Sequence, residues 1–306
     1  MGRSVLTAAS AAAVLVFLAA CGSGSTPSTS VSGESAASMS QAVVEDGHVL
    51  PGTHLLRPHQ VIGSGLSGQI AKPSENLVYH NGQVMLFPAI GLVYWGFNRK
   101  NADPDNEIPY LNSFLLHLRD SYPLNVVTQY YEISGGHKYY IPNYPAMSIA
   151  FWYDDVNALP SPHPTDKDVQ QEALRAASHF NFQLPGADNL IIVAIPHGVP
   201  MNYAACAYHG RVDGFTYTNL PYQPDFGAGC GAYSVNPGPI GILDAVTETT
   251  IHEVAESMTD PLFFGWYGPG GEIGDKCQQF AANVTIHGAT FPVQPLWSNE
   301  TSDCRY

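Results

Sequence analysis

The sequence predicts an α/β (α+β) domain in which helices pack on a mixed sheet, and three features lead to that expectation. Apolar runs of strand type alternate with segments of helical periodicity in the first half of the chain. A very apolar run at 189–195 has the composition of a central strand. A late helical segment, residues 244–259, carries ionisable side chains at a spacing that suits chemistry. Together these features are typical of one domain with a functional helix late in the chain.

An export signal precedes this domain. After Arg3, residues 8–20 form an uncharged apolar run that is too short to span a bilayer as a finished helix. The run ends in Leu18-Ala19-Ala20-Cys21, which resembles a bacterial lipobox. We therefore predict a signal peptide at 1–20, lipidation at Cys21, and an extracytoplasmic lipoprotein at the cell surface or in the periplasm. The alternative is an ordinary secretory signal that happens to end before a cysteine.

Residues 21–50 are predicted to form a flexible tether. Most of this segment is rich in Ser, Gly, Thr and Ala, and such a composition buries too little apolar surface to offset the entropy of ordering. Residues 51–306 have neither an internal repeat nor a second linker, so we expect one globular domain. No later stretch reaches the roughly 18 uncharged apolar residues of a membrane span, which leaves the lipid anchor as the expected membrane contact.

The composition excludes several function classes. The chain has 26 Asp and Glu against 12 Lys and Arg, so it lacks the basic surface that neutralises nucleic-acid phosphates. It also has no Gly-rich phosphate loop, no Gly-x-Ser-x-Gly elbow and no Cys-x-x-Cys pair. We therefore expect no nucleic-acid or nucleotide partner, no serine hydrolase chemistry and no thioredoxin-like chemistry.

The first half is expected to hold strands on both sides of one helix. A buried strand is predicted at 84–95, and a helix capped by Asp105 follows it. The apolar residues of that helix recur at helical spacing: Ile108, Leu111, Phe114, Leu115 and Leu118. The β-rich runs at 126–133 and 147–153 predict two further strands.

The second half is expected to hold two helices around one long irregular segment. Thr165 caps the first helix, whose apolar face comprises Val169, Ala173, Ala176, Ala177 and Phe180. Residues 196–241 are rich in Gly, Pro and Tyr and are predicted to be irregular, at a length that usually indicates function. Asp244 caps the next helix, and Asp260 before Pro261 ends it. A hairpin is expected at 284–293.

Four cysteines besides Cys21 predict two disulfide bonds, because an even number in an exported domain is typical of such bonds. Three pairings exist, and we prefer Cys206–Cys230 with Cys277–Cys304 because both close local loops. The alternative is a zinc site of four thiolates, which the lack of any Cys-x-x-Cys pair disfavours.

The segment His252-Glu253-Val254-Ala255-Glu256 predicts a metal site. His252 and Glu256 lie four residues apart and project from nearly one face of a helix, so both reach one ion. Glu253 lies one step round the helix, where it can act as general base on a water that the metal polarises, as in His-Glu-x-x-His zinc proteases. The alternative is a solvated helix face with an ordinary i,i+4 pair of side chains.

A glycine-flanked loop, residues 270–275, is expected to supply the third ligand. We predict Asp275 in that place, with Glu272 as the alternative. Zn²⁺ suits a three-ligand site of imidazole and carboxylates, while two carboxylates leave Mn²⁺ or Fe²⁺ open. His209 is a second candidate ligand or substrate contact, although a structural histidine beside a disulfide is the favoured interpretation.

These motifs resemble the phosphate-induced, EXORDIUM-like protein family, which has plant and bacterial members. The resemblance covers residues 77–306, and its most specific block runs from His252 to Cys277. The matching motifs are His252-Glu253-Val254-Ala255-Glu256, Thr259-Asp260-Pro261-Leu262, Gly265-Trp266-Tyr267, Glu272-Ile273-Gly274-Asp275-Lys276-Cys277, Tyr79-His80-Asn81-Gly82 and Cys206-Ala207-Tyr208-His209. The chain departs from the plant pattern at Asp260, where asparagine is common. The resemblance implies an extracellular protein with a single zincin-like domain, but no particular reaction.

Two functions from different classes follow. The first is a metal-dependent, peptidase-like hydrolase in which His252, Glu256 and Asp275 bind zinc and Glu253 is the general base. The second is a non-catalytic extracellular protein in which the same residues hold a structural metal and the loops bind a cell-wall polymer, a peptide or a partner. Glu253 divides the two, because a structural site has no use for an unligated glutamate beside the water position.

Overall fold

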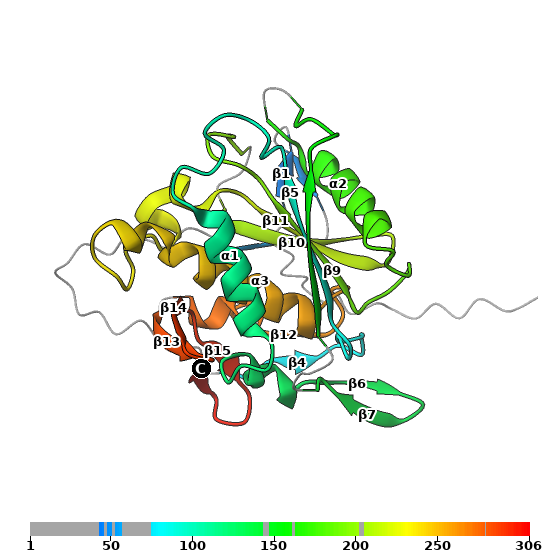
Figure 1. Cartoon of the computed structure of the whole chain (residues 1–306). Coiled ribbons are helices and arrows are strands. Elements are labelled where there is room, and N and C mark those ends of the chain that lie inside the picture. Colours follow the sequence, from blue (N-terminus) through cyan, green and yellow to red (C-terminus); the bar gives the residue numbers. More distant parts are fainter. Residues whose placement is uncertain are drawn as a thin grey trace, which may run out of the picture. The chain divides into compact units, whose positions relative to one another are not determined.

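A six-stranded mixed sheet forms the centre of the fold (Figure 1). The computed structural model describes residues 75–142, 147–160, 163–201, 205–278 and 280–306, and the backbone of three short strands, β1 (Val43–Glu45), β2 (His48–Leu50) and β3 (Thr53–Leu56). Contacts divide the chain into residues 1–38 and 39–306, and every described residue belongs to the second part. The predicted signal peptide and Cys21 lie outside the described residues. The predicted tether overlaps β1 and β2.

The order of strands in the sheet is β3, β10 (Ala207–Val212), β11 (Phe215–Leu220), β9 (Asn189–Ala194), β5 (Ala89–Trp95) and β8 (Ser148–Asp154). The four strands from β11 to β8 are parallel, whereas β10 runs antiparallel to both of its neighbours. The run at 189–195 is therefore a central strand, as its composition predicts, and the mixed sheet with several helices confirms the predicted α/β class.

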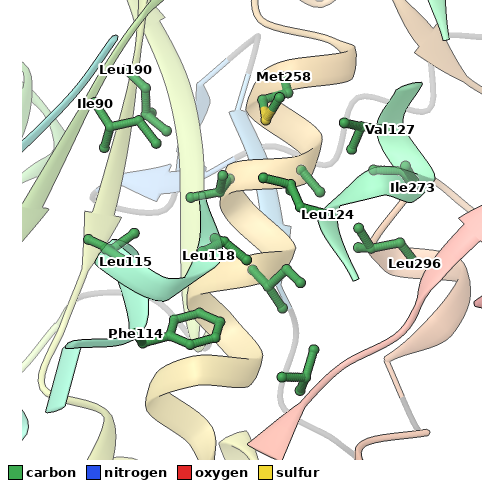
Figure 2. Close-up of a cluster of buried hydrophobic side chains, with 14 of the residues drawn as sticks. Ile90, Phe114, Leu115, Leu118, Leu124, Val127, Leu190, Met258, Ile273 and Leu296 are labelled. Carbon is green, nitrogen blue, oxygen red and sulfur yellow. The ribbon is translucent and has the colours of Figure 1, made fainter. Parts of the chain in front are cut away.

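Helices cover both faces of this sheet (Figure 1). Helices α1 (Glu107–Leu118) and α3 (Asp244–Thr259) pack on one face, and α2 (Asp166–His179) packs on the other. Because side chains alternate along a strand, β5 sends Leu92 toward α1 and α3 and sends Val93 toward α2. Figure 2 shows side chains of the larger core, among them Phe114 and Leu118, gathered around α3.

Smaller elements surround the sheet. Four two-stranded ladders pair β4 (Val78–Tyr79) with β12 (Trp266–Tyr267), β6 (Tyr131–Ser134) with β7 (His137–Tyr140), β13 (Ala282–Ile286) with β14 (Ala289–Val293), and β15 (Leu296–Ser298) with β16 (Asp303–Arg305). Short 3-10 helices span Leu124–Gln129, Gln223–Cys230, Pro239–Leu243 and Asp275–Cys277. The β13–β14 pair confirms the hairpin predicted at 284–293.

The sequence predicted the apolar faces of α1 and α2 correctly. In α1, Leu111, Phe114, Leu115 and Leu118 are all buried. In α2, Thr165 accepts a hydrogen bond from the backbone of Asp168, whose carboxylate accepts from the backbone and hydroxyl of Thr165. That reciprocal arrangement is a capping box. The helix end predicted at Asp260-Pro261 is confirmed as well.

Two predicted helix caps were wrong. Asp105 does not cap α1, because Asn106 has a left-handed backbone and turns the chain so that Asp103 accepts from the N–H groups of Glu107 and Ile108. Asp244 does not cap α3 either. It is the first residue of that helix, and its carboxylate accepts from the backbone N–H groups of residues 235 and 236 in the preceding loop.

Two predicted strands are shorter than expected. The sheet strand begins at Ala89 rather than at Val84, because the N–H of Met85 donates to the end of α3 and those of Leu86 and Phe87 donate to Asp188. The run at 126–133 forms a strand only from Tyr131, since the preceding residues form a 3-10 turn whose valines pack into the core. Tertiary burial thus outweighs local β propensity there.

The segment 196–241 was predicted to be irregular, and that prediction was wrong. It contains β10 and β11, joined by a turn at Asp213-Gly214 in which both residues have positive φ. An Asp-Gly pair between two runs of alternating side chains is the usual signal of a tight hairpin. The correction matters because β10 carries His209.

In the described part of the chain, no helix is long and apolar enough to cross a membrane.

Candidate metal centre

The candidate site is built on α3, which is buried on every side. All sixteen residues of this helix are buried, including His252, Glu253 and Glu256. An ordinary surface helix would turn such polar side chains toward solvent, but α3 lies between the sheet, α1 and the C-terminal ladders. Buried ionisable groups are stable only where partners or cations compensate them. The sequence alternative of a solvated helix face is therefore wrong.

His252, Glu256 and Asp275 form one group of metal-ligand type. One potential ligand atom of each lies within 4.8 Å of the others. The Nε2 of His252 lies 3.0 Å from Oε1 of Glu256 and 3.7 Å from Oδ1 of Asp275. The structure thus brings together the three residues that the sequence predicted as ligands.

Gln294 holds the imidazole of His252 in this orientation. The Nε2 amide of Gln294 donates to the carbonyl oxygen of Gly274 at 2.8 Å, which leaves its Oε1 to accept from Nδ1 of His252 at 3.3 Å. A proton on Nδ1 leaves the lone pair of Nε2 directed at Glu256 and Asp275. Ligating histidines in metal proteins are oriented by such a second hydrogen bond.

The loop that carries Asp275 is fixed against α3 by backbone contacts. The N–H of Asp275 donates to Oε1 of Glu256 at 3.0 Å, and the N–H of Glu272 donates to Oδ2 of Asp275 at 3.0 Å. Gly274 leaves room for the imidazole, since a Cβ there would lie 2.6 Å from Nδ1 of His252. The Cys277–Cys304 disulfide, with an S–S distance of 2.08 Å, ties the end of this loop to β16.

His209, Glu256 and Glu272 form a second group of the same type, and all three are buried. His209 reaches it from the sheet. Its neighbour Tyr208 packs with α2, so alternation along β10 turns His209 toward α3. The imidazole lies 3.2 Å from Glu253 and 3.6 Å from Glu256 through Nδ1, and 3.5 Å from Glu272 through Nε2. Glu272, predicted as an alternative third ligand beside His252, belongs to this second group.

The second predicted disulfide lies next to this strand. Cys206, directly before β10, bonds to Cys230 with an S–S distance of 2.05 Å. Both preferred pairings are therefore confirmed, and with them the alternative of a four-thiolate zinc site is wrong. The two bonds indicate an oxidising compartment.

The electrostatics of the site fit a bound cation. Burial raises the pKa of Glu253, and also that of Asp260. Burial, followed by the charge of Glu256, raises the pKa of Asp275 to about 7. Burial lowers the pKa of His252, but the charge of Glu256 and the hydrogen bond with it outweigh that effect and raise the pKa to about 10. A divalent cation would favour the ionised carboxylates and the neutral imidazole.

Oε1 of Glu253 is buried and lacks a hydrogen-bond partner among the described residues. No described lysine or arginine forms an ion pair with Glu253 or Asp275. Buried polar atoms are rarely left without partners in folded proteins. The donor set of one imidazole and two carboxylates is one that binds zinc, manganese or iron. The residues present therefore fit a divalent cation.

Sequence reasoning ranked one member of the cluster too low and missed the place of another. His209 was favoured as a structural residue, and the Asp213-Gly214 hairpin was the available signal that places it on a strand facing the helix. Asp260 was considered as a helix terminator and as a departure from the plant pattern, yet its buried carboxyl group accepts from the N–H of Gly265 at 2.5 Å and lies against Glu272. Comparison of the chain with protein-family models, with curated proteins and with solved structures gave no match. The EXORDIUM-like resemblance therefore stays a prediction.

Proposed function

We propose that this chain is a metal-dependent hydrolase of zincin-like type, in which His252, Glu256 and Asp275 hold a divalent cation, zinc by default. The observation that carries the proposal is the environment of Glu253. Its Oε1 is buried with no hydrogen-bond partner among the described residues, while its Oε2 lies 3.2 Å from Nδ1 of His209. One oxygen is thus oriented and the other remains for a proton.

The chemistry divides between the cation and the protein. A divalent cation in such a site supplies Lewis acidity and lowers the pKa of water. Glu253 takes the proton of the attacking water at Oε1 and returns it to the leaving group. Burial raises the pKa of Glu253 above the ordinary value of a glutamate, and a more basic carboxylate accepts a proton more readily. His209 is a positioning residue for Glu253.

Access to the site favours small or extended substrates. In the group of His252, Glu256 and Asp275, the side chain of Asp275 is 21% exposed, whereas that of His252 is fully buried. A substrate would therefore approach from the Asp275 side. We propose an extended peptide, or the peptide part of a cell-wall polymer, as the substrate class. Lipidation at Cys21 would place this chemistry outside the cell, beside the membrane.

The same burial supports a second candidate, a binding protein with a structural metal. His209 and His252 both have 0% exposure. Structural metal sites are closed, while catalytic sites keep one open position. In this alternative the cation stabilises the packing of α3 against the loop, and a cell-wall polymer or partner binds elsewhere.

The test is Glu253→Gln, which keeps the shape of the side chain but removes its basicity. We expect the variant to fold, to bind the metal at wild-type stoichiometry and to lose hydrolysis by about 10²–10⁴-fold. Substrates would come from a broad peptide library screened with the metal-loaded wild type. Glu248→Gln is the matched control, because Glu248 is another buried glutamate of α3, bonded to Ser234 and outside the site.

His252→Ala should behave differently from Glu253→Gln and lose the metal, since ligation and folding are coupled. Equal loss of metal from both variants would make Glu253 a ligand and overturn its role as base. A metal-loaded wild type that cleaves nothing in the library would favour the binding protein.

A further inference from the structure

The two groups of ligand type share one residue, Glu256. The first group joins it to His252 and Asp275, and the second joins it to His209 and Glu272. The five residues come from three separate segments: the sheet strand β10, the helix α3 and the loop after β12. Two histidines and two carboxylates thus converge around Glu256, more side chains than the three protein ligands of a catalytic zinc site.

The two oxygens of Glu256 serve the two groups separately. Oε1 lies 3.0 Å from Nε2 of His252, and Oε2 lies 3.6 Å from Nδ1 of His209. A carboxylate whose oxygens face different imidazoles has the geometry of a bridging ligand. In two-metal enzymes the cations are about 3.5–4 Å apart, a separation that one carboxylate spans.

The hydrogen bonds of the two imidazoles follow the same logic. Nδ1 of His252 is held by Gln294 at 3.3 Å, which leaves Nε2 for a cation. Nδ1 of His209 is held by Glu253 at 3.2 Å, and Nε2 faces Oε2 of Glu272 at 3.5 Å. In each ring Nδ1 is therefore fixed by a side-chain oxygen and Nε2 faces a carboxylate, the arrangement expected of a metal ligand.

A further carboxyl group lies at the second position. Asp260 and Glu272 lie within hydrogen-bond reach of one another, and both are fully buried. The Oδ2 atom of Asp260 has no hydrogen-bond partner among the described residues. A second buried carboxyl group thus lies beside the histidine and glutamates of this group.

We propose that His209, Glu256 and Glu272 bind a second divalent cation, so that the site is a dinuclear centre bridged by Glu256. The inference rests on the proposed function for its first cation, held by His252 and Asp275. Zinc, manganese and iron are the cations that suit both donor sets. A second cation would add Lewis acidity for the attacking water or for the carbonyl oxygen of a peptide.

The test is metal stoichiometry of the full-length protein loaded with Zn²⁺ and freed of excess by gel filtration. We expect two equivalents in the wild type, one in His209→Asn and one in His252→Asn. Asparagine keeps a hydrogen-bonding group near the position of Nδ1 and removes Nε2. His137→Asn is the matched control, because His137 is exposed on β7, and it should keep two equivalents.

A second measurement reports the bridge itself. With Mn²⁺ in place of zinc, electron paramagnetic resonance should give the signal of an exchange-coupled pair in the wild type and of an isolated ion in His209→Asn. If His209→Asn fails to fold, Glu272→Gln is the substitute, since it keeps the shape and removes one ligand charge. It should also retain one equivalent and lose the coupled signal.

The outcomes separate the two proposals. The wild type could bind a single equivalent of metal. If His209→Asn and Glu272→Gln keep that equivalent and His252→Asn loses it, the second site is overturned and the proposed function stays intact. If instead His252→Asn keeps the single equivalent of metal and His209→Asn loses it, the dinuclear centre is overturned and the proposed metal moves to the group of His209. An uncoupled manganese signal at two equivalents overturns the bridge.

Discussion

Replacing Gly274 with alanine should push the imidazole of His252 out of its ligand position. A Cβ at Gly274 would lie 2.6 Å from Nδ1, 2.7 Å from Cγ and 2.9 Å from Cε1 of that ring. Gly274 has φ −81°, a conformation that alanine adopts without strain. The three atoms nearest to such a Cβ all belong to His252, so we expect the substitution to act mainly through that ring.

The packing around His252 sets how much stability and metal affinity Gly274→Ala should lose. An ordinary contact begins at 3.4 Å, so the ring and the loop must separate by about 3.4 − 2.6 = 0.8 Å. His252 is fully buried and bonded to Gln294, so the ring has little space in which to move. Overpacking of this kind costs about 1–3 kcal/mol of stability. Since ligand distances tolerate only about 0.2 Å, we expect metal affinity to fall by about 10–100-fold.

The assay is a double-mutant cycle. Urea unfolding of metal-free protein gives the stability loss for Gly274→Ala in the wild type and in a His252→Ala background. A chelator competition gives the metal affinity. If the ring is the obstacle, the loss of stability should nearly disappear once the ring is gone. The same loss in both backgrounds, or unchanged metal affinity in the single variant, would refute the reasoning.

Four other perturbations have expected outcomes. Thr165→Ala removes the cap of α2 and should lower the free energy of unfolding by about 0.5–2 kcal/mol in urea. Replacing Cys277 and Cys304 by serine opens a loop with a sequence separation of 27 and should lower that free energy by about 3–4 kcal/mol relative to the oxidised wild type. Burial raises the pKa of Glu248 from 4.5 to about 8, so its folded form holds the proton more tightly; the stabilisation is complete below pH 4.5 and is lost as the pH rises toward 8. Glu248→Gln should therefore flatten the fall of stability over that window by up to about 1.4 kcal/mol per pH unit, and an unchanged slope would contradict the assignment. Cys21→Ser should release the protein from membranes or block its processing, and complete membrane partition after normal signal cleavage would place the anchor elsewhere.

The sequence predicted those parts of the fold that local rules govern. The face of α2, its cap at Thr165 and the end of α3 all depend on residues within a turn or two of one another, so their signals survive in a single sequence. Asp105 failed as a cap because the left-handed backbone of Asn106 decides which carboxylate faces the helix. Periodicity carries no information on such a turn.

The candidate site was predictable only in part, for the same reason. The spacing of His252 and Glu256 on one helix is local, and the structure places them as expected. The position of His209 depends on how β10 pairs with β11 and which of its faces meets α3, and both are tertiary properties. The choice between Asp275 and Glu272 depends on the path of the loop around Gly274, which puts the two carboxylates into different groups that share Glu256.

Because α3 is enclosed on every side, it offers no face on which sequence variation is free. An amphipathic helix such as α2 tolerates change at its outward positions, so its tolerance to substitution should rise and fall with a period of three to four residues. In α3 each of the sixteen positions contacts the interior. In a library of all single substitutions, scored for the amount of folded protein, every position from 244 to 259 should therefore tolerate few substitutions. For folding, the ligand positions should be no more sensitive than the apolar residues between them.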